Sequence, residues 1–467
     1  MSLERRLLAL DHKLALLERE TGAWQAESAG PTSRFALHAS QIGAVCQDLE
    51  TMRRRIDQDI ELQRAAPTHD ALLRQERRIL AALQIWDSYR AKWAFRVEPR
   101  LAETLNLIDD LAWQAYRPAL QRALASGTLA PEQARLPPLV YPSPRWSPFA
   151  RPREQGYELD EASGNWSVVD DFDTLLHCMP VPLIGIPWTQ AAHLAEAVFV
   201  GHEVGHLVEE DLALAEPLRQ ALLTALGSAD AGRAAAWSED WRSEVFADLW
   251  GLLCCGPAYA WMLADLLGDG AATLDAAQPD ARGRFGAYPP RALRLRLLGE
   301  GLRQLSPGPA GVFAADAAAI DALAAALPAP HPMPAYEADV AAVVSALLNT
   351  PLATFATGIG KAAQPLRGLF GFTATMQQQA QADARRALVR QTLAGNDLRV
   401  LFAALALAFR QAPDKIRDVQ ARFEARLSQV RTQGVRSGVL LPAAVDADAR
   451  HRAVAEAVFD WVDRHQD

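Results

Sequence analysis

The sequence predicts a mainly α-helical protein that contains a small antiparallel β element. Leucines recur at three- and four-residue spacing in the first helical stretch, at Leu7, Leu10, Leu14 and Leu17. Six prolines between residues 137 and 152 cannot continue a helix, and strand-like segments follow them. Beyond about residue 300 the chain is Ala-rich and then helical again. We therefore predict an N-terminal helical domain over residues 1–135, a central domain over 136–305 and a C-terminal helical region over 306–467.

Two segments of the central domain predict the β element. Residues 157–159 and 166–169 flank the turn sequence Ser-Gly-Asn at 163–165, which is typical of a hairpin. The apolar run 181–186 lies between prolines and predicts a short strand. We expect this strand to form an edge of the sheet, where it could pair with an extended peptide.

Composition and charge exclude several classes of protein. The chain of 467 residues has 56 acidic and 47 basic side chains, and its net charge of −9 argues against a surface that binds nucleic acid. Its four cysteines, of which Cys254 and Cys255 are adjacent, are too few for a disulfide framework. We therefore expect a reducing compartment, the cytoplasm.

The sequence predicts neither a signal peptide nor a membrane span. Charged residues occur in every turn of the N-terminal stretch, which therefore lacks an apolar core. The segment Leu249–Leu267 approaches the length of a membrane span, but Gly256 and Pro257 interrupt it and Asp265 would be charged in the bilayer. A buried pair of helices is the better interpretation.

The motif His-Glu-Val-Gly-His at residues 202–206 is the main candidate for chemistry. We expect it on one helix that Thr189 caps and that continues to about Glu209. On a helix, His202 and His206 stand one turn apart on the same face, so both imidazoles can reach one zinc ion at about 2.0–2.1 Å. Glu203 points toward the same side and can take a proton from a water molecule on the metal.

Two glycines lie inside this expected helix. Gly201 and Gly205 each cost the helix up to about 1 kcal/mol relative to alanine. Because they stand one turn apart, we expect another element, or a substrate backbone, to approach closely along that side.

A catalytic zinc site needs a third protein ligand, and a downstream segment offers candidates. Glu244 and Asp248 are separated by one helical turn, so one carboxylate can bind metal while the other supports a histidine ligand. Large apolar residues surround the pair, and buried carboxylates usually need a partner such as a cation. These apolar residues are Trp237, Trp241, Phe246, Leu249 and Trp250.

With these motifs, residues 180–300 resemble the gluzincin zinc metallopeptidases. The branch that contains the CAAX-prenyl and heat-shock membrane peptidases is most similar, because its third-ligand motif Glu-x-x-Ala-Asp resembles Glu-Val-Phe-Ala-Asp at 244–248. That branch continues with His-Pro and an arginine six positions after the histidine. Here Tyr288 replaces the histidine, while Pro289 and Arg294 are retained. The chain also lacks the membrane helices of that branch, which implies a different substrate.

The resemblance implies a zincin-like catalytic core and a role for each matching residue. His202, His206 and Glu244 would bind Zn²⁺, and Asp248 would orient a histidine. Glu203 would act as general base and then as general acid. Tyr288 and Arg294 would lie near the site and stabilise the oxyanion or anchor the substrate, although a tyrosine at a helix start and a solvent-facing arginine are equally consistent with the sequence.

We therefore predict a zinc-dependent metallopeptidase that acts on a peptide or protein substrate. Its long helical flanks would restrict the cleft or dock a helical protein partner. Two alternatives remain open at this stage. One is a non-catalytic helical scaffold with a structural or degenerate zinc site, and the other is a zinc hydrolase of a non-peptide amide or ester.

Several lesser candidates favour structural interpretations. His193 lies nine residues before His202, and on a continuous helix it would face away from the metal. His177 with Cys178, and His331, lack suitably spaced partners. Tyr259 follows Gly256 and Pro257 and could reach the cleft, but core packing is the favoured interpretation.

Overall fold

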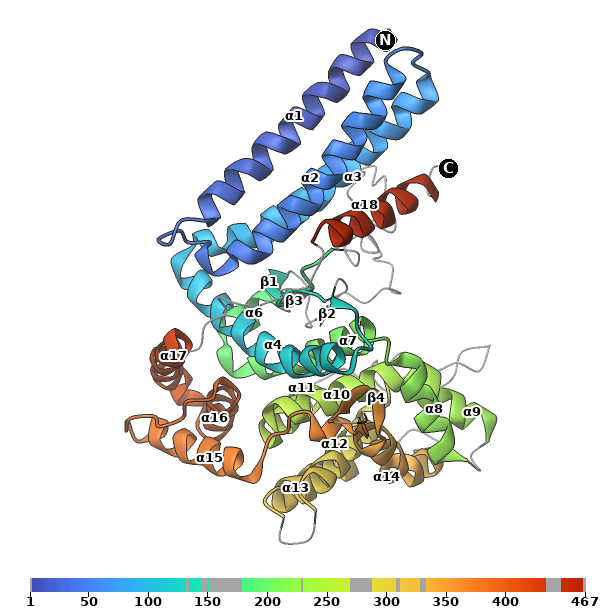
Figure 1. Cartoon of the computed structure of the whole chain (residues 1–467). Coiled ribbons are helices and arrows are strands. Elements are labelled where there is room, and N and C mark those ends of the chain that lie inside the picture. Colours follow the sequence, from blue (N-terminus) through green and yellow to red (C-terminus); the bar gives the residue numbers. More distant parts are fainter. Residues whose placement is uncertain are drawn as a thin grey trace.

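The computed structural model confirms a mainly α-helical fold (Figure 1). It describes residues 2–131, 134–143, 149–150, 179–227, 230–268, 288–307, 311–327, 333–358, 360, 362–433 and 447–464. The predicted hairpin at 157–169 and the candidates His177, Cys178 and His331 lie outside these residues. None of the described helices is long and apolar enough to cross a membrane.

The helices occur throughout the chain, and the strands form two small sheets. The helices in the first half of the chain are α1 (Leu3–Ser28), α2 (Ala39–Gln63), α3 (His69–Ala94), α4 (Pro99–Ser126), α6 (Trp188–Ala192), α7 (Val200–Asp211), α8 (Ala215–Leu226) and α9 (Ala231–Ala235). Those in the second half are α10 (Arg242–Cys255), α11 (Pro257–Gly268), α12 (Arg291–Leu305), α13 (Ala314–Ala326), α14 (Met333–Asn349), α15 (Ala374–Leu388), α16 (Leu398–Gln411), α17 (Ile416–Gln433) and α18 (Ala447–Arg464). The strands are β1 (Leu139–Ser143), β2 (Phe149–Ala150), β3 (Leu183–Pro187), β4 (Leu352–Thr357) and β5 (Ala362–Gln364).

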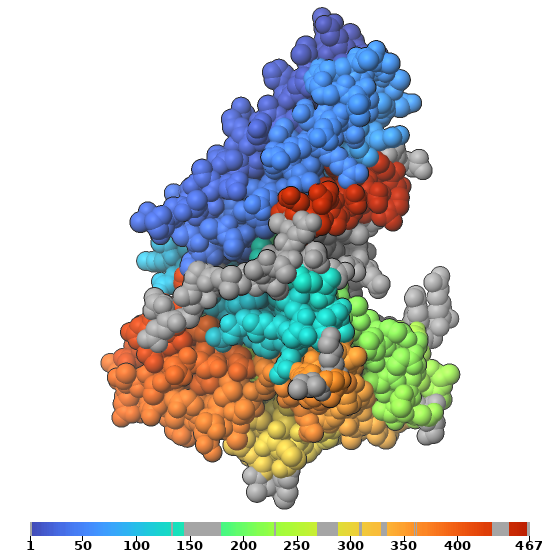
Figure 2. Space-filling view, in the orientation of Figure 1, coloured from blue at the N-terminus to red at the C-terminus, as the bar shows by residue number. Residues whose placement is uncertain are grey.

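Helices α1, α2 and α3 form a long bundle that projects from the rest of the molecule (Figure 2). The leucines at three- and four-residue spacing in α1 are buried against α2 and α3, as their period predicts. Side-chain caps fix two of the helix starts: Ser2 accepts from the backbone N–H of Arg5, and Thr68 accepts from that of Ala71. The C-terminal helix α18 lies against α2 and α3.

The buried hydrophobic residues form two clusters, and these differ from the three predicted regions. One cluster contains the bundle together with α18, so the end of the chain packs on its beginning. The other contains α4 and most of the chain from residue 184 to residue 430. The predicted boundaries at 135 and 305 therefore do not separate hydrophobic cores, because helix α4 and the segment after 305 pack on the same residues as the central segment.

The sheet β1-β3-β2 lies between these clusters. Leu139 of β1 and Leu183 of β3 belong to the cluster of the bundle, whereas their neighbours Val140 and Ile184 belong to the other cluster. Successive residues of a strand face opposite sides of a sheet, so one strand contributes to both cores. This double burial explains why apolar residues follow one another at Leu139–Val140 and at Leu183–Ile184.

Two expectations about this sheet were wrong. The β element is mixed rather than antiparallel, since β1 pairs with β3 in parallel and β2 pairs with β3 in antiparallel orientation. Strand β3, expected at an edge, is the central strand. Its backbone is paired with Leu139–Ser143 on one side and with Phe149–Ala150 on the other, so it cannot receive a peptide there as predicted.

The expected helix from Thr189 to Glu209 is divided into three pieces. Helix α6 ends at Ala192, and the φ of −124° and ψ of 80° at the next residue, His193, are not helical. A 3₁₀ segment, Leu194–Phe199, follows and leads into α7. Thr189 lies inside α6 instead of capping it, and Pro187 occupies the cap position. His193 fits the break because its ring binds Glu196 and packs on Phe409.

Helices α10 and α11, which correspond to the predicted buried pair, meet at Gly256. Its φ of +58° lies in the left-handed region, which glycine adopts without strain. A Cβ at this position would also lie 2.3 Å from the ring of Phe372. The chain therefore turns at Gly256, and α11 begins at the next residue.

The two glycines of the motif segment allow helix α7 to lie directly against α10. A Cβ on Gly205 would lie 2.7 Å from the Cα atom of Ala247, and one on Gly201 would lie 3.0 Å from the Cβ atom of Cys254. The element expected to approach closely is therefore helix α10. This contact brings the residues at 202–206 beside those at 244–248.

We predict that Gly205→Ala lowers the thermal unfolding temperature. The added methyl group meets the backbone of α10, and overpacking of this kind costs about 1–3 kcal/mol. Gly43→Ala is the matched control, because it lies inside α2 and its Cβ would meet no atom within 4 Å. It should stabilise the protein by about 0.4–1 kcal/mol. Equal unfolding temperatures for Gly205→Ala and wild type, measured by circular dichroism, would contradict the assigned contact.

Candidate metal centre

Three side chains from helices α7 and α10 converge on one point. The Nε2 atoms of His202 and His206 are 3.2 Å apart. Glu244 on α10 faces both, with Oε2 3.3 Å from Nε2 of His202 and Oε1 3.5 Å from Nε2 of His206. These are the donor atoms through which imidazole and carboxylate groups bind metal ions.

The separation of the two imidazole nitrogens fits a tetrahedral ion. Two ligand atoms bound tetrahedrally to zinc at about 2.0–2.1 Å are separated by about 3.3–3.4 Å. The two Nε2 atoms are 3.2 Å apart, near this value, and Glu244 places Oε2 3.3 Å from one of them and Oε1 3.5 Å from the other. With one ligand atom taken from each residue, the three atoms lie within 4.8 Å of one another. In addition, Oε2 of Glu244 is buried and accepts no hydrogen bond, which is costly without a partner. The three residues could therefore hold a metal ion.

The other nitrogen of each imidazole is also bound. Nδ1 of His202 lies 2.9 Å from Oδ1 of Asp248, and Nδ1 of His206 lies 3.0 Å from Oγ of Ser243. Such contacts hold ligand histidines in one orientation. The structure thus places Asp248 beside a histidine, on the helix that also carries Glu244 and Ser243.

Electrostatic interactions at the cluster favour a positive charge there. Burial favours the neutral imidazole of His202, but interactions with the carboxylates of Asp248 and Glu244 outweigh burial and raise the pKa of His202 to about 10. Burial also disfavours the Glu244 carboxylate, but the imidazoles of His206 and His202 outweigh this effect and lower the pKa of Glu244. A bound metal ion would replace the proton that the imidazole otherwise holds between these carboxylates.

Arg294 on α12 binds Asp248 through two nitrogens. Nε donates to Oδ2 at 2.6 Å and Nη2 donates to Oδ1 at 2.9 Å. Burial alone would raise the pKa of Asp248, but the charge of Arg294 outweighs burial and lowers it. The guanidinium, predicted to lie near the site, pairs with Asp248 because α12 packs against α10.

The two remaining predicted residues come from helix α7 and from the residues just before α12. Glu203 is next to His202 on α7 and only 4% exposed. Tyr288 precedes α12 and is 52% exposed, with its ring 5.1 Å from the guanidinium carbon of Arg294. The negative charge of Glu244 raises the pKa of Tyr288, so its hydroxyl stays protonated at neutral pH. An accessible hydroxyl donor therefore lies near the converging ligands.

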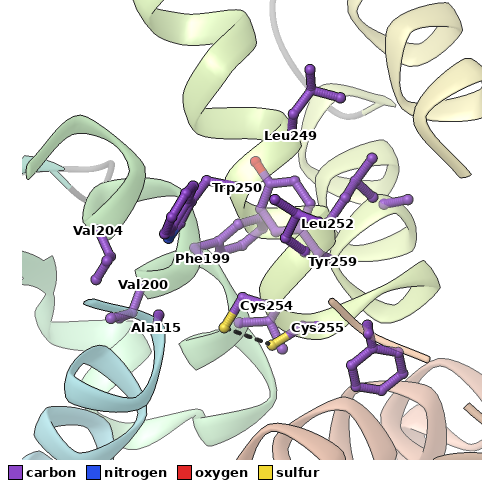
Figure 3. Packing of buried hydrophobic residues seen from close by; sticks show 14 of the residues in the cluster. Ala115, Phe199, Val200, Val204, Leu249, Trp250, Leu252, Cys254, Cys255 and Tyr259 are labelled. Atoms are coloured by element: carbon purple, nitrogen blue, oxygen red, sulfur yellow. Dashed lines mark hydrogen bonds between the residues drawn. The ribbon is translucent and has the colours of Figure 1, made fainter. Parts of the chain in front are cut away.

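Two further residues contact the cluster: Tyr259, for which the sequence favours core packing, and Ser243, which the sequence does not single out. Tyr259 is buried, as core packing predicts, but its hydroxyl donates to Oδ1 of Asp248 at 2.6 Å. Figure 3 shows its ring among buried side chains such as Phe199 and Trp250. The sequence signal for Tyr259 is its position just after the turn at Gly256, from which its side chain can reach the cluster. Ser243 adjoins Glu244 and carried no separate signal.

Comparison with protein-family models, with curated proteins and with solved structures gave no significant match. The assignment of His202, His206 and Glu244 as a candidate metal site therefore depends on the geometry of these three side chains.

We predict that the purified protein contains about one divalent metal ion per chain, and that His202→Ala or Glu244→Ala abolishes binding. Each substitution removes one of three converging ligands. His193→Ala is the control, because His193 binds Glu196 outside the cluster. Elemental analysis of protein purified with and without added zinc measures the content. Retention of metal by both ligand variants would contradict the site.

Proposed function

We propose that the protein is a zinc-dependent metallopeptidase of the gluzincin type. The observation that carries the proposal is the convergence of two imidazole nitrogens and one carboxylate within 3.5 Å, with Glu203 adjacent on the same helix. Zinc suits a set of two nitrogens and one oxygen, and three protein ligands leave a fourth position for water. The resemblance of residues 202–206 and 244–248 to gluzincin motifs supports the same assignment.

The chain's own residues have distinct roles in this proposal. A zinc ion at the site would supply a Lewis acid that polarises the scissile carbonyl and makes water more acidic. Glu203 takes the proton of the attacking water and delivers it to the leaving amine. The Tyr288 hydroxyl donates a hydrogen bond to the developing oxyanion. Asp248, held by Arg294, keeps His202 oriented.

The substrate in this proposal is a peptide or protein, and the compartment is the cytoplasm. The described cysteines Cys46, Cys254 and Cys255 are buried and free, which suits a reducing environment. The projecting bundle of α1–α3 is the proposed docking element for a helical protein partner.

The scaffold and the non-peptide hydrolase remain the competing functions. A structural zinc site usually has four protein ligands. Within the described part of the chain, three residues offer converging ligand atoms, which favours the open site of an enzyme. Assays with unfolded proteins alongside small amides and esters distinguish a peptidase from the other hydrolases.

We predict that Glu203→Gln reduces peptide hydrolysis by at least about 10²-fold while zinc stays bound. The amide keeps the size of the side chain but cannot accept the proton, and general-base catalysis contributes about 10²–10⁴-fold. Glu196→Gln, in the 3₁₀ segment before α7, is the control and should retain wild-type turnover. Wild-type hydrolysis by Glu203→Gln would refute the mechanism.

Removal of the Tyr288 hydroxyl should lower kcat more than it changes KM. Loss of one oxyanion donor typically costs about 10²–10³-fold in kcat. Tyr288→Phe retains the ring that packs on Arg294, so only the donor is removed. Steady-state kinetics on a cleaved peptide measure both constants. A rise in KM at constant kcat would indicate ground-state binding of the substrate instead.

A further inference from the structure

We propose that Tyr259 is a positioning residue for the metal centre, whose hydroxyl acts with Asp248 to fix the His202 imidazole with Nε2 directed toward the ion. This inference rests on the metal centre of the proposed function. It assigns a determinant of metal affinity to α11, an element outside the motif segments at 202–206 and 244–248.

The hydrogen-bond geometry determines the role of the hydroxyl. It lies 2.6 Å from Oδ1 of Asp248 and 3.2 Å from Nδ1 of His202. A tyrosine has one hydroxyl proton, and the ionised carboxylate is the stronger acceptor, so that proton lies toward Asp248. The oxygen therefore presents a lone pair to Nδ1 of His202.

Nδ1 of His202 consequently faces two acceptors. Asp248 Oδ1 at 2.9 Å and the Tyr259 oxygen at 3.2 Å can both accept from it, and neither can donate to it. Nδ1 must carry a proton in this arrangement. In the neutral imidazole the lone pair then lies on Nε2, the atom that faces His206 and Glu244.

The packing around Tyr259 holds the hydroxyl in place. Tyr259 is the third residue of α11, close after the turn at Gly256, and its side chain is fully buried. Gly251 of α10 leaves room for the ring, since a Cβ there would lie 2.6 Å from the ring atoms Cε2 and Cζ. The ring of Phe199 lies edge-on to it at 6.2 Å. The position of the hydroxyl therefore depends on the tight fit between α10 and α11.

The chain contains a second buried tyrosine with the same type of hydrogen bond. Tyr116 donates to Oδ2 of Asp211 at 2.7 Å, and Arg135 pairs with the same carboxylate. Asp211 is the last residue of α7 and is not part of the metal-ligand cluster. Tyr116→Phe thus removes a comparable hydrogen bond from the same hydrophobic cluster without changing the surroundings of His202.

The test compares Tyr259→Phe with Tyr116→Phe in the full chain. Zinc dissociation constants are measured by competition with a chromogenic chelator, and the visible spectrum of the Co²⁺-loaded protein reports the ligand geometry. We expect Tyr259→Phe to bind zinc about 10–100-fold more weakly and to change the cobalt spectrum, as losses of such supporting groups do. Tyr116→Phe should match wild type in both measurements. Unfolding temperatures of the metal-free proteins show how much stability each variant loses with its hydrogen bond.

A second variant tests the same hydroxyl without removing it. Gly251→Ala places a methyl group against the Tyr259 ring and displaces the hydroxyl, so it should also weaken zinc binding. This variant decides the question if Tyr259→Phe fails to fold.

Other outcomes would overturn the inference. If the unmodified protein binds zinc and hydrolyses peptides, and Tyr259→Phe binds zinc with the same affinity, the role of Tyr259 is refuted while the proposed function stands. Equal weakening in Tyr116→Phe assigns the effect to general destabilisation and also refutes it. Absence of zinc binding by wild type refutes the metal centre and this inference with it.

Discussion

The direct contact between helices α7 and α10 determines the candidate site. Gly205 and Gly201 place no side chain of their own between the helices, so the backbone of Ala247 approaches the helix that carries both histidines. An alanine at either glycine would force the helices apart or displace a neighbour. The oxygens of Glu244 on α10 lie 3.3 and 3.5 Å from the imidazole nitrogens on α7, so a displacement of either helix would separate the ligands. The two glycines therefore fix the geometry of the cluster at the cost of intrinsic helix stability.

Local spacing explains what the sequence predicts well. His202 and His206 share a helix face because they are four residues apart, and the same period relates Glu244 to Asp248. The leucine period of α1 and the break at Gly256 are equally local, and the structure confirms both. Such features depend on a few neighbouring residues, so a single sequence is sufficient to identify them.

The features that the sequence does not predict depend on packing between distant segments. Strand β3 is central because β1 and β2, both more than thirty residues earlier, pair on its two sides. The helix break at His193 coincides with contacts to Phe409 on α16. Likewise, the hydroxyl of Tyr259 and the guanidinium of Arg294 both reach Asp248 only when α11 and α12 fold against α10. No periodicity near those residues encodes these partners.

Arg294 pairs with Asp248, so the positive charge that balances the cluster comes from α12, outside the motif segments at 202–206 and 244–248. In the metal-loaded cluster both imidazoles are neutral, and Glu203, Glu244 and Asp248 contribute three negative charges. A divalent cation alone therefore leaves one negative charge in excess. The guanidinium from α12 makes the loaded cluster electrically neutral. A fragment that ends after α11 would contain every ligand and still lack this counter-charge, so the charge balance of the site requires Arg294 on α12.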